Sequence, residues 1–489
     1  MNNYLLLLPI LFPMITGAFL AMFKLKGKTL DYTALGIAGV TFVLTLVAVL
    51  GGDSSLTLMS VTDLLTIKLS VDNLGRMFSL LSAFMWILAV MFSFEYMHHE
   101  GHQTRFYSFM LINLGICVGL PLAANIFTLY MFYELLTVLS LPLVIHSFSK
   151  DAMQAGKKYL MYSFFGAGLV LVGFLFLNHF GTTLEFTVGG VLDMAKVAGN
   201  ETLVLLLFIC MFIGFSVKAG MFPLHAWLPA AHPIAPAPAS ALLSGVITKA
   251  GVVAIIRVMF YLFGVEFIAN TWAHNFLLVL TLASVFMGSM LAYKEQHFKR
   301  RLAYSSVSQL SYVLFGIITA SSVGMTGALM HVVAHSAIKV TLFFVAGVMI
   351  FKAEIHHVDE VRGLGKSMPI TMICYSIVSL GLVGIPPTTG YVSKWFLAQG
   401  SLGLANQVIA YAGPIVLLLS ALLTAGYLIP LFIDAFFPGS DFDYDSVKKL
   451  EPGMTTLLPI IVLTLITLFV GMFPTQLLSF IETITTVLF

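Results

Sequence analysis

Residues 216–262 read SVKAGMFPLHAWLPAAHPIAPAPASALLSGVITKAGVVAIIRVMFYL and hold two lysines in otherwise apolar sequence. Lys218 and Lys249 stand on either side of the proline-rich segment 223–238. A lysine within a membrane is costly unless it finds a partner or water, so its presence indicates function. Because non-helical backbone at membrane depth persists only inside protein or beside water, the stretch predicts a broken helix beside an ion pathway.

The composition of the whole chain is that of a polytopic membrane protein. Of its 489 residues, 59% are hydrophobic and only 9% are charged, which is far from the composition of soluble domains. The formal net charge of +2 gives no indication of a nucleic-acid partner. The N-terminal stretch lacks a basic region and a cleavage site, so it predicts a retained first span.

At about 20 apolar residues per crossing, the sequence predicts an all-α protein with about fourteen transmembrane helices. Their expected ranges are 3–23, 30–50, 73–95, 107–123, 126–147, 156–179, 202–222, 237–263, 272–293, 303–321, 325–350, 369–400, 406–436 and 454–484.

Basic residues gather in every second connection between these spans, which by the positive-inside rule places those connections in the cytoplasm. They are Lys24, Lys26, Lys28, Arg105, Lys150, Lys157, Lys158, Lys294, Lys299, Arg300, Arg301, Lys352, Arg362, Lys366, Lys448 and Lys449. We therefore expect a chain in the cytoplasmic (cell inner) membrane with both termini outside. The longest connections, 51–71 and 181–202, are then also outside, and we expect them to form short hairpins.

Two parts of the chain share two features, a helix interrupted by proline and a lysine close to the interruption. A proline break follows Lys218 in the first part, and the sequence Gly-Ile-Pro-Pro at 384–387 precedes Lys394 in the second. Because each part holds five spans, the two would be inverted relative to the membrane. The expected division is a three-span region 1–106, a first five-helix repeat 107–264, a second inverted repeat 265–436 and a C-terminal span 437–489.

Glu134 is the only one of 22 acidic residues that lies near the middle of an expected span. An isolated carboxylate there would take up a proton, so we expect Glu134 to pair across helices with Lys218 and to tune that lysine. A purely structural ion pair is the alternative. Lys249 lies near the centre of its span and cannot easily reach an interface, whereas Arg257 on the same helix is expected to be a structural anchor.

His331, His335 and Lys339 recur every four residues in the eleventh span and therefore line one helix face. Imidazole and a desolvated amine both titrate near neutral pH, so this stripe predicts a proton relay. A metal site is the alternative, but the two histidines alone offer only two ligands. The three cysteines, Cys117, Cys210 and Cys374, lie far apart in the sequence and form no metal-binding motif. We therefore expect no metal and no bound cofactor.

Lys394 follows the second break and is expected to end the pathway on the outer side. The alternative is that Lys394 has no role in the pathway and only extends its amine to the membrane interface. The tenth span carries hydroxyl groups that either hold water beside the path or pack helices together. They are Tyr304, Ser305, Ser308, Ser311 and Tyr312. His225 and His232 are candidates for the cytoplasmic entry.

These segments resemble a known family: the antiporter-like proton-conducting subunits of respiratory complex I, energy-converting membrane-bound hydrogenases and Mrp-type Na+/H+ antiporters. The resemblance covers about 107–427 and rests on the motifs FYELL, KAGMFPLHAWLPAAHPIAPAP, SALLSGVITKAG, FKRRLAYSSVSQLSY, HVVAHSAIKVTLFF and GIPPTTGYVSKW. Within the family, the length of the chain is similar to that of the M-type subunit of complex I and the D-type subunit of Mrp antiporters.

The resemblance implies that Glu134 and Lys218 form a pair, and that Lys249 and the stripe on the eleventh span make a central axis. Lys394 stands where some members of the family have lysine and others glutamate.

The expected function is proton translocation, coupled to redox chemistry in partner subunits, with exchange for Na+ left open. On this interpretation, the redox reactions take place in the partner subunits and not in this chain. The alternative within the family is a D-type subunit of a stand-alone Mrp antiporter. Expected partners are membrane subunits of the same complex, including another antiporter-like subunit, together with protons, Na+ and lipid. A substrate transporter and a non-conducting scaffold are the rival classes.

Overall fold

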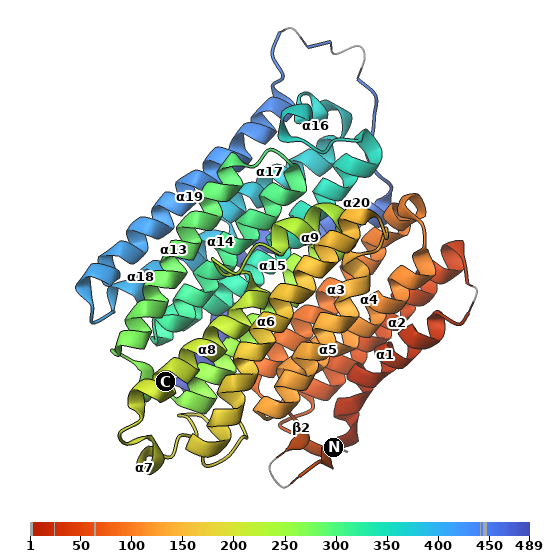
Figure 1. Ribbon diagram of the computed structural model, residues 1–489. Helices are drawn as coiled ribbons and strands as arrows, with labels where there is room; N and C mark the ends of the chain where they lie inside the picture. Colours follow the sequence, from red (N-terminus) through yellow and green to blue (C-terminus); the bar gives the residue numbers. More distant parts are fainter. Residues whose placement is uncertain (1–2, 24, 63–64, 441, 444–446) are drawn as a thin grey trace.

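The computed structural model describes residues 3–23, 25–62, 65–440, 442–443 and 447–489, which form a bundle of long helices lying side by side (Figure 1). Within this described part, twelve helices are long and apolar enough to cross a membrane, judged by length and composition. The chain is therefore a multi-pass α-helical membrane protein, as its composition predicts. Lys24, one of the basic residues counted above, lies outside the described residues.

The described elements follow one another along the chain in the following order. They are η1 (Asn3–Leu7), α1 (Leu8–Leu20), α2 (Gly27–Leu50), β1 (Ser55–Ser60), β2 (Thr66–Ser70), α3 (Asn73–Glu100), α4 (Gln103–Gly119), η2 (Leu120–Leu122), α5 (Ile126–Val144), α6 (Lys150–Phe180), α7 (Met194–Val197), α8 (Glu201–Ala219), α9 (Leu228–Ile234), α10 (Ala237–Leu242), η3 (Leu243–Ile247), α11 (Lys249–Ile256), η4 (Arg257–Phe263), α12 (Val265–Ile268), α13 (Trp272–Lys294), α14 (Phe298–Ile318), α15 (Ser322–Ala353), η5 (Val358–Val361), α16 (Leu364–Ser367), α17 (Pro369–Val383), α18 (Thr389–Leu402), α19 (Gln407–Phe436), α20 (Met454–Met472) and α21 (Thr475–Leu488).

Two of the expected spans are not among the twelve helices. The range 303–321 corresponds to α14, which is long enough but begins with three basic residues and carries several serines. The range 369–400 corresponds to two short helices, α17 and α18, which are separated by residues 384–388. In both places the polar and helix-breaking residues that attracted attention in the sequence also lower the apolar character of the helix.

The first predicted break lies between α8 and α10. Helix α8 ends at Ala219. The next residue, Gly220, has a φ of 77°, a conformation that glycine adopts readily, and the short α9 follows. Trp227 Nε1 donates to Val217 O at 2.8 Å, and Lys299 Nζ donates to Ala235 O at 2.5 Å. Side chains within the protein thus satisfy carbonyls that the break leaves free, as irregular backbone in a membrane requires.

Lys299 and Arg301, which were expected in the connection before the tenth span, lie within helix α14. This helix begins at Phe298, and the two side chains are only 2% and 6% exposed. Arg301 Nη1 donates to Tyr427 O at 2.8 Å. The expected start of the span at 303 was too late, because counting charges does not detect buried carbonyls that attract a cation into the bundle.

Helix α15 lies at the centre of the bundle and contacts helices from both parts of the chain. It packs on α14, α17, α18 and α20, and also on α3 and α10. Phe92 of α3 stacks on Phe344 of α15 with ring centres 4.1 Å apart. Glu95 of α3 forms a salt bridge with Lys352 near the end of α15. The helix with the predicted histidine stripe is therefore enclosed by protein.

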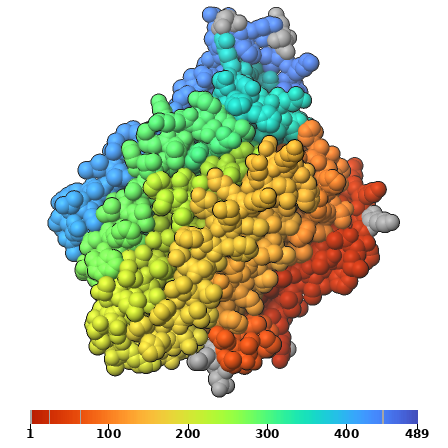
Figure 2. Space-filling view, viewed as in Figure 1, coloured from red at the N-terminus to blue at the C-terminus, as the bar shows by residue number. Residues whose placement is uncertain are grey.

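Helices α6 and α8 approach each other closely at two glycines. A Cβ atom on Gly166 would lie 2.6 Å from Gly214 O, and a Cβ atom on Gly214 would lie 2.5 Å from Gly166 O. Any larger residue would push the two helices apart. The opposite face of α6 is exposed, including Met161 and Phe165, and the segment around 150–180 covers much of the face seen in Figure 2.

At the other end of the bundle from the α8–α10 break, strands β1 and β2 pair as an antiparallel hairpin. This confirms the hairpin expected in the connection 51–71. Lys68 of β2 forms a salt bridge of 2.8 Å with Glu185 in the connection 181–202. Nearby, Arg257 binds Asp72 through two hydrogen bonds of 2.6 and 2.9 Å. The arginine thus fixes the end of its helix to the start of α3.

Candidate functional site

Lys218 is buried near the C-terminal end of α8 and takes its hydrogen-bond partners from α5. Its Nζ donates to Thr137 Oγ1 at 2.8 Å and to Tyr133 O at 3.1 Å. The amine also lies 4.1 Å from the centre of the Tyr133 ring, where a cation is attracted electrostatically. Thr137 was not singled out in the sequence, although it lies one turn from Glu134 on the same helix.

Glu134 is half-buried on α5, and its Oε1 has no hydrogen-bond partner among the described residues. Within that part of the chain, no ion pair of 4.0 Å or less joins Glu134 to Lys218. The direct pair expected from the sequence is thus open in this structure, because Thr137 and a backbone carbonyl bind the amine instead. Glu134 remains a neighbouring charge, since Tyr133 and Thr137 flank it on the same helix.

Lys249 lies where the π-helical turn η3 meets α11. Its Nζ donates to Ser244 O at 2.6 Å and lies 2.8 Å from His335 Nδ1. A π-helical turn alters the backbone hydrogen-bonding pattern and is frequent at functional sites. A cavity of about 20 Å³ adjoins Lys249 and is also lined by Cys117 and Ser82. That volume is sufficient for about one water molecule.

The stripe predicted on one helix face is present on α15, and all three side chains are buried. His335 faces Lys249, while Lys339 donates to Leu302 O at 2.9 Å and to Ser305 Oγ of α14. His335 and His331 stack with ring centres 6.2 Å apart. The stripe therefore contacts α11 through one member and α14 through another.

His331 connects the stripe to the second break. Its Nδ1 lies 2.9 Å from Ser393 Oγ of α18, and its Nε2 lies 3.1 Å from Gln309 Oε1 of α14. Its ring stacks on Tyr312 with centres 5.5 Å apart. Sequence reasoning did not single out Gln309 or Ser393. The sequence could have indicated both residues. Gln309 is the one amide side chain in its expected span, and Ser393 directly precedes Lys394.

Lys394 of α18 binds the end of α17. Its Nζ donates to Leu382 O at 2.6 Å and to Val383 O at 2.9 Å. These are carbonyls of the last helical turn, which have no partner within the helix. The amine also lies 5.0 Å from the centre of the Tyr312 ring. Lys394 therefore caps α17 at the second break. The sequence pattern, a lysine after Gly-Ile-Pro-Pro, did not predict this capping role.

We call this set of polar side chains the axis; most of them are buried, whereas Glu134 and Lys394 are half-buried. Its members are Glu134, Lys218, Lys249, His335, Lys339, His331, Tyr312 and Lys394. In the described part of the chain, no hydrogen bond joins Lys218 to Lys249. The helices that carry these two lysines nevertheless touch, because a Cβ atom on Gly251 of α11 would lie 2.5 Å from Phe215 O of α8.

The hydroxyl groups of α14 divide between the axis and helix packing. Tyr312 belongs to the axis, and Ser305 contacts its member Lys339. Ser308 bonds to Ser289 of α13 at 2.8 Å, and Ser311 bonds to Ser284 of the same helix at 2.6 Å. Helix packing is thus shown for Ser308 and Ser311, and a role for these hydroxyl groups in holding water remains a prediction.

The two histidines near the first break lie apart from the axis contacts. His232 is fully buried in α9 and stacks on Phe343 of α15 with ring centres 4.7 Å apart. His225 lies between α8 and α9, where its ring centre is 6.2 Å from that of Tyr304. A role for either residue in proton entry remains a prediction.

Family models place this arrangement of helices in a known family. The model described as NADH:quinone oxidoreductase/Mrp antiporter, TM, matches residues 123–420, and the model described as NADH-Ubiquinone oxidoreductase (complex I), chain 5 N-terminus, matches 59–107. The chain belongs to the NADH:quinone oxidoreductase/Mrp antiporter family. The resemblance identified from the sequence motifs is thereby confirmed.

Relatives come from three kinds of assembly. The chain is 28% identical to the N-type subunit of the NADH-quinone oxidoreductase of Desulforudis audaxviator, over 84% of this chain and 83% of the relative. It is also 28% identical to the D-type subunit of the Na(+)/H(+) antiporter of Alkalihalophilus pseudofirmus, over 96% and 94%. It is 29% identical to the hydrogenase-4 component B of Escherichia coli, over 76% of this chain but only 56% of that protein.

Solved structures share the fold over nearly the full length. Chains in the archaeal membrane-bound sulfane sulfur reductase, the Mrp complex of Dietzia sp. and respiratory complex I of Thermus thermophilus match with TM-scores of 0.85, 0.83 and 0.81. Their identities are 21%, 19% and 23%, and the matches cover 99–100% of this chain and 97%, 98% and 100% of theirs. All three are subunits of multisubunit membrane complexes. This chain is an antiporter-like membrane subunit of the same kind.

Proposed function

We propose that the chain translocates protons across the membrane along the axis that runs from Glu134 and Lys218 to Lys394. The observation that carries the proposal is the contact of 2.8 Å between Lys249 Nζ and His335 Nδ1. Two basic groups this close cannot both hold a proton without strong repulsion. One proton shared between an amine and an imidazole can instead move between them with a small displacement.

Transfer along the rest of the axis follows from the same chemistry. His331 presents one ring nitrogen to Ser393 and the other to Gln309, so both nitrogens have polar partners as a proton passes. The aromatic ring of Tyr312 contacts both His331 and Lys394 and stabilises positive charge on either residue. Lys394 then delivers the proton beside the second break, on the outer side of the membrane.

Glu134 supplies the control of this pathway in the proposal. When its carboxylate approaches Lys218, it favours the charged amine; when it withdraws, the amine releases a proton. At an effective dielectric constant near 20, opening such a pair by a few ångströms changes the interaction by roughly 1–2 kcal/mol. The open arrangement, with Thr137 bound to the amine, is one of the two positions this switch requires.

We also propose fourteen crossings, with 1–106 as an N-terminal region, 107–264 and 265–436 as inverted five-helix repeats and 437–489 as a C-terminal segment. In support, a helix in each repeat is interrupted, and a lysine borders each interruption. Lys299 satisfies a carbonyl at the first break and Lys394 does so at the second. In this arrangement the chain lies in the cell inner membrane with both termini outside.

Partner subunits supply the driving force in this proposal. Coupling to redox chemistry is the main form, because relatives and structural neighbours include NADH-quinone oxidoreductase and the sulfane sulfur reductase. The alternative is a stand-alone Mrp-type Na+/H+ antiporter, which is favoured by the match to a D-type antiporter subunit over nearly the full length of both chains. In either assembly the axis carries protons, and Na+ exchange would be a property of the whole complex.

The test uses the native complex reconstituted into vesicles that contain a pH-sensitive dye. We expect proton movement in the parent and its loss in Lys249→Met, while Lys294→Met at the exposed end of α13 leaves it unchanged. Equal translocation in the parent and in Lys249→Met would support a scaffold instead. Co-purifying iron–sulfur and flavin proteins would identify a redox complex, whereas small hydrophobic subunits alone would identify an antiporter.

A further inference from the structure

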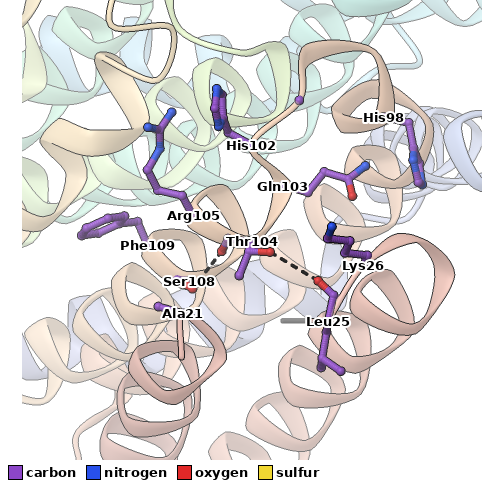
Figure 3. A pocket seen from close by; sticks show the side chains of 11 residues that line it. Ala21, Leu25, Lys26, His98, His102, Gln103, Thr104, Arg105, Ser108 and Phe109 are labelled. Atoms are coloured by element: carbon purple, nitrogen blue, oxygen red, sulfur yellow. Dashed lines mark hydrogen bonds between the residues drawn. The ribbon is translucent and has the colours of Figure 1, made fainter. Parts of the chain in front are cut away.

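A cavity of about 660 Å³ lies at one end of the bundle, away from the axis, between the α1–α2 connection and the start of α4. Figure 3 shows Lys26 and Gln103 near each other in this view, with the hydrogen bond from Thr104 to Leu25 O beside them. The N-terminal helices form an edge of the molecule (Figure 2). Because the cavity joins two helix-to-helix connections, it lies at the level where the bundle meets the membrane surface.

The polar wall of the cavity is suited to an anion. Lys26 and Arg105 each bring a positive charge, His98 and His102 add two imidazoles, and no acidic residue is among the lining residues that the structure describes. Asp31, which is buried behind this lining, is bound by His98 Nε2 at 3.0 Å and by Tyr107 at 2.9 Å. Both carboxylate oxygens of Asp31 thus have a partner within the protein.

The first turn of α4 adds backbone donors to this wall. His102 precedes the helix in a left-handed conformation and provides no side-chain cap. The N–H groups of the first turn of a helix have no acceptor within the helix and bear partial positive charge. The first three residues of α4, Gln103, Thr104 and Arg105, all line the cavity. In addition, Arg105 Nε is buried without a hydrogen-bond partner in the described part of the chain.

Part of the cavity lining is apolar. Ala21, Leu25 and Phe109 belong to it, and the chain beside Ala21 exposes Phe19 and Met22, which are 53% and 76% accessible. A small soluble anion would use only the polar lining. A ligand that uses both parts of the lining needs a negatively charged group joined to a long apolar chain.

We propose that this cavity binds an anionic phospholipid, with the headgroup phosphate between Lys26 and the first turn of α4 and an acyl chain along the end of α1. The basic residues Lys26 and Lys28 belong to a connection expected in the cytoplasm, and the cytoplasmic leaflet carries the anionic lipids. The bound lipid would seal the edge of the subunit where α1 and α2 are otherwise least enclosed. The proposal requires only that the chain is inserted in a membrane, so its test does not depend on whether the chain translocates protons.

The test is lipid retention by the full chain in detergent, measured with spin-labelled phosphatidylglycerol and with phosphatidylcholine. We expect phosphatidylglycerol to bind at least fivefold more tightly. Lys26→Gln should weaken it several-fold, since one basic residue near the surface contributes about 1 kcal/mol to anionic-lipid binding. Lys28→Gln, two residues away and outside the cavity lining, should not. Ala21→Trp, which fills the apolar wall without changing charge, should also weaken binding.

Equal binding of the two lipids, or no effect of Lys26→Gln beyond that of Lys28→Gln, would overturn the proposal. Full displacement of phosphatidylglycerol by millimolar inorganic phosphate would overturn it in favour of a soluble anion. Unchanged binding in Ala21→Trp would show that the acyl chain does not enter the cavity, and would overturn the proposal in the same way. The melting temperature of each variant separates weaker binding from loss of the fold.

Discussion

Lys249 Nζ lies 2.8 Å from His335 Nδ1, so the broken helix after α10 and the central helix α15 meet through two basic side chains. Two such groups would repel each other if both were protonated. The contact therefore favours a single proton on the pair. It also joins the two parts of the chain that the sequence presents as separate repeats.

Replacing Lys249 by methionine is expected to abolish translocation while the chain still assembles. Methionine keeps a similar length but supplies no proton and no donor for Ser244 O. We expect at least a tenfold loss of proton flux in reconstituted vesicles, with normal levels of the complex in the membrane. Lys294→Met serves as the matched control, because that lysine is exposed at the end of α13. A variant at 249 that retains full flux would exclude this residue from the pathway.

The sequence predicted the breaks well and the contacts poorly. Glycines and prolines act locally, so the interruptions at 220–236 and 384–388 follow from the chain itself, as does the stripe at every fourth residue of α15. The partners of Lys299, Lys394 and Lys218 are backbone carbonyls or a threonine on other segments. Such partners carry no charge signal, so neither the burial of Lys299 nor the open position of Glu134 is visible in the sequence.

Glu134→Gln should damage translocation far more than stability. Because Glu134 Oε1 has no hydrogen-bond partner in the described residues, the amide loses no direct contact, and we expect a change in unfolding free energy below about 1 kcal/mol. Translocation should fall at least tenfold, because the charge that controls Lys218 is gone. Glu134→Asp keeps the charge and should retain part of the flux. Equal loss in both variants would point to packing geometry as the cause.

Lys394→Arg is expected to be nearly inactive, because a guanidinium keeps its proton. Lys394→Glu should retain measurable flux, although its carboxyl can meet Leu382 O and Val383 O only while protonated. We therefore expect the flux of the glutamate variant to fall as pH rises, more steeply than that of the parent. The pH dependence of dye-detected flux measures this. An arginine variant as active as the parent would mean that Lys394 supplies only a fixed positive charge.

His297 should make the loop before α14 sensitive to acid. Burial, followed by the positive charges of neighbouring residues, lowers the pKa of His297 from 6.5 to about 4. The neighbouring groups are Arg300, Lys299, His357 and His356. As pH falls from about 6.5 toward 4, the unfolded chain binds the proton before the folded chain does, so stability is lost on acidification.

The corresponding measurement is thermal stability in detergent between pH 7 and 5. His297→Gln should lose less stability than the parent over this range. The difference should be at most about 2 kcal/mol, since His297 is only half-buried and solvent screens its charge. His99→Gln, at an exposed position on α3, should follow the parent. Parallel pH curves for the parent and His297→Gln would contradict the assignment.

Both termini and the connection 181–202 should lie outside, and the α13–α14 connection should lie in the cytoplasm. In a background without the native cysteines, Lys196→Cys should react with a membrane-impermeant maleimide added to whole cells. Lys294→Cys should react only after the membrane is opened. Both side chains are exposed, so neither result depends on burial. The reverse pattern would invert the topology.

The backbone contact between Gly166 and Gly214 has a mechanical consequence. With no side chain between them, the two backbones are in direct contact, so a displacement of α6 toward α8 is passed on without a side chain that could change rotamer and absorb it. The exposed face of α6 lies on the side of that helix away from α8, and α8 carries Lys218. A neighbouring subunit pressing on α6 would shift that amine relative to Glu134 on α5 without ever touching either residue.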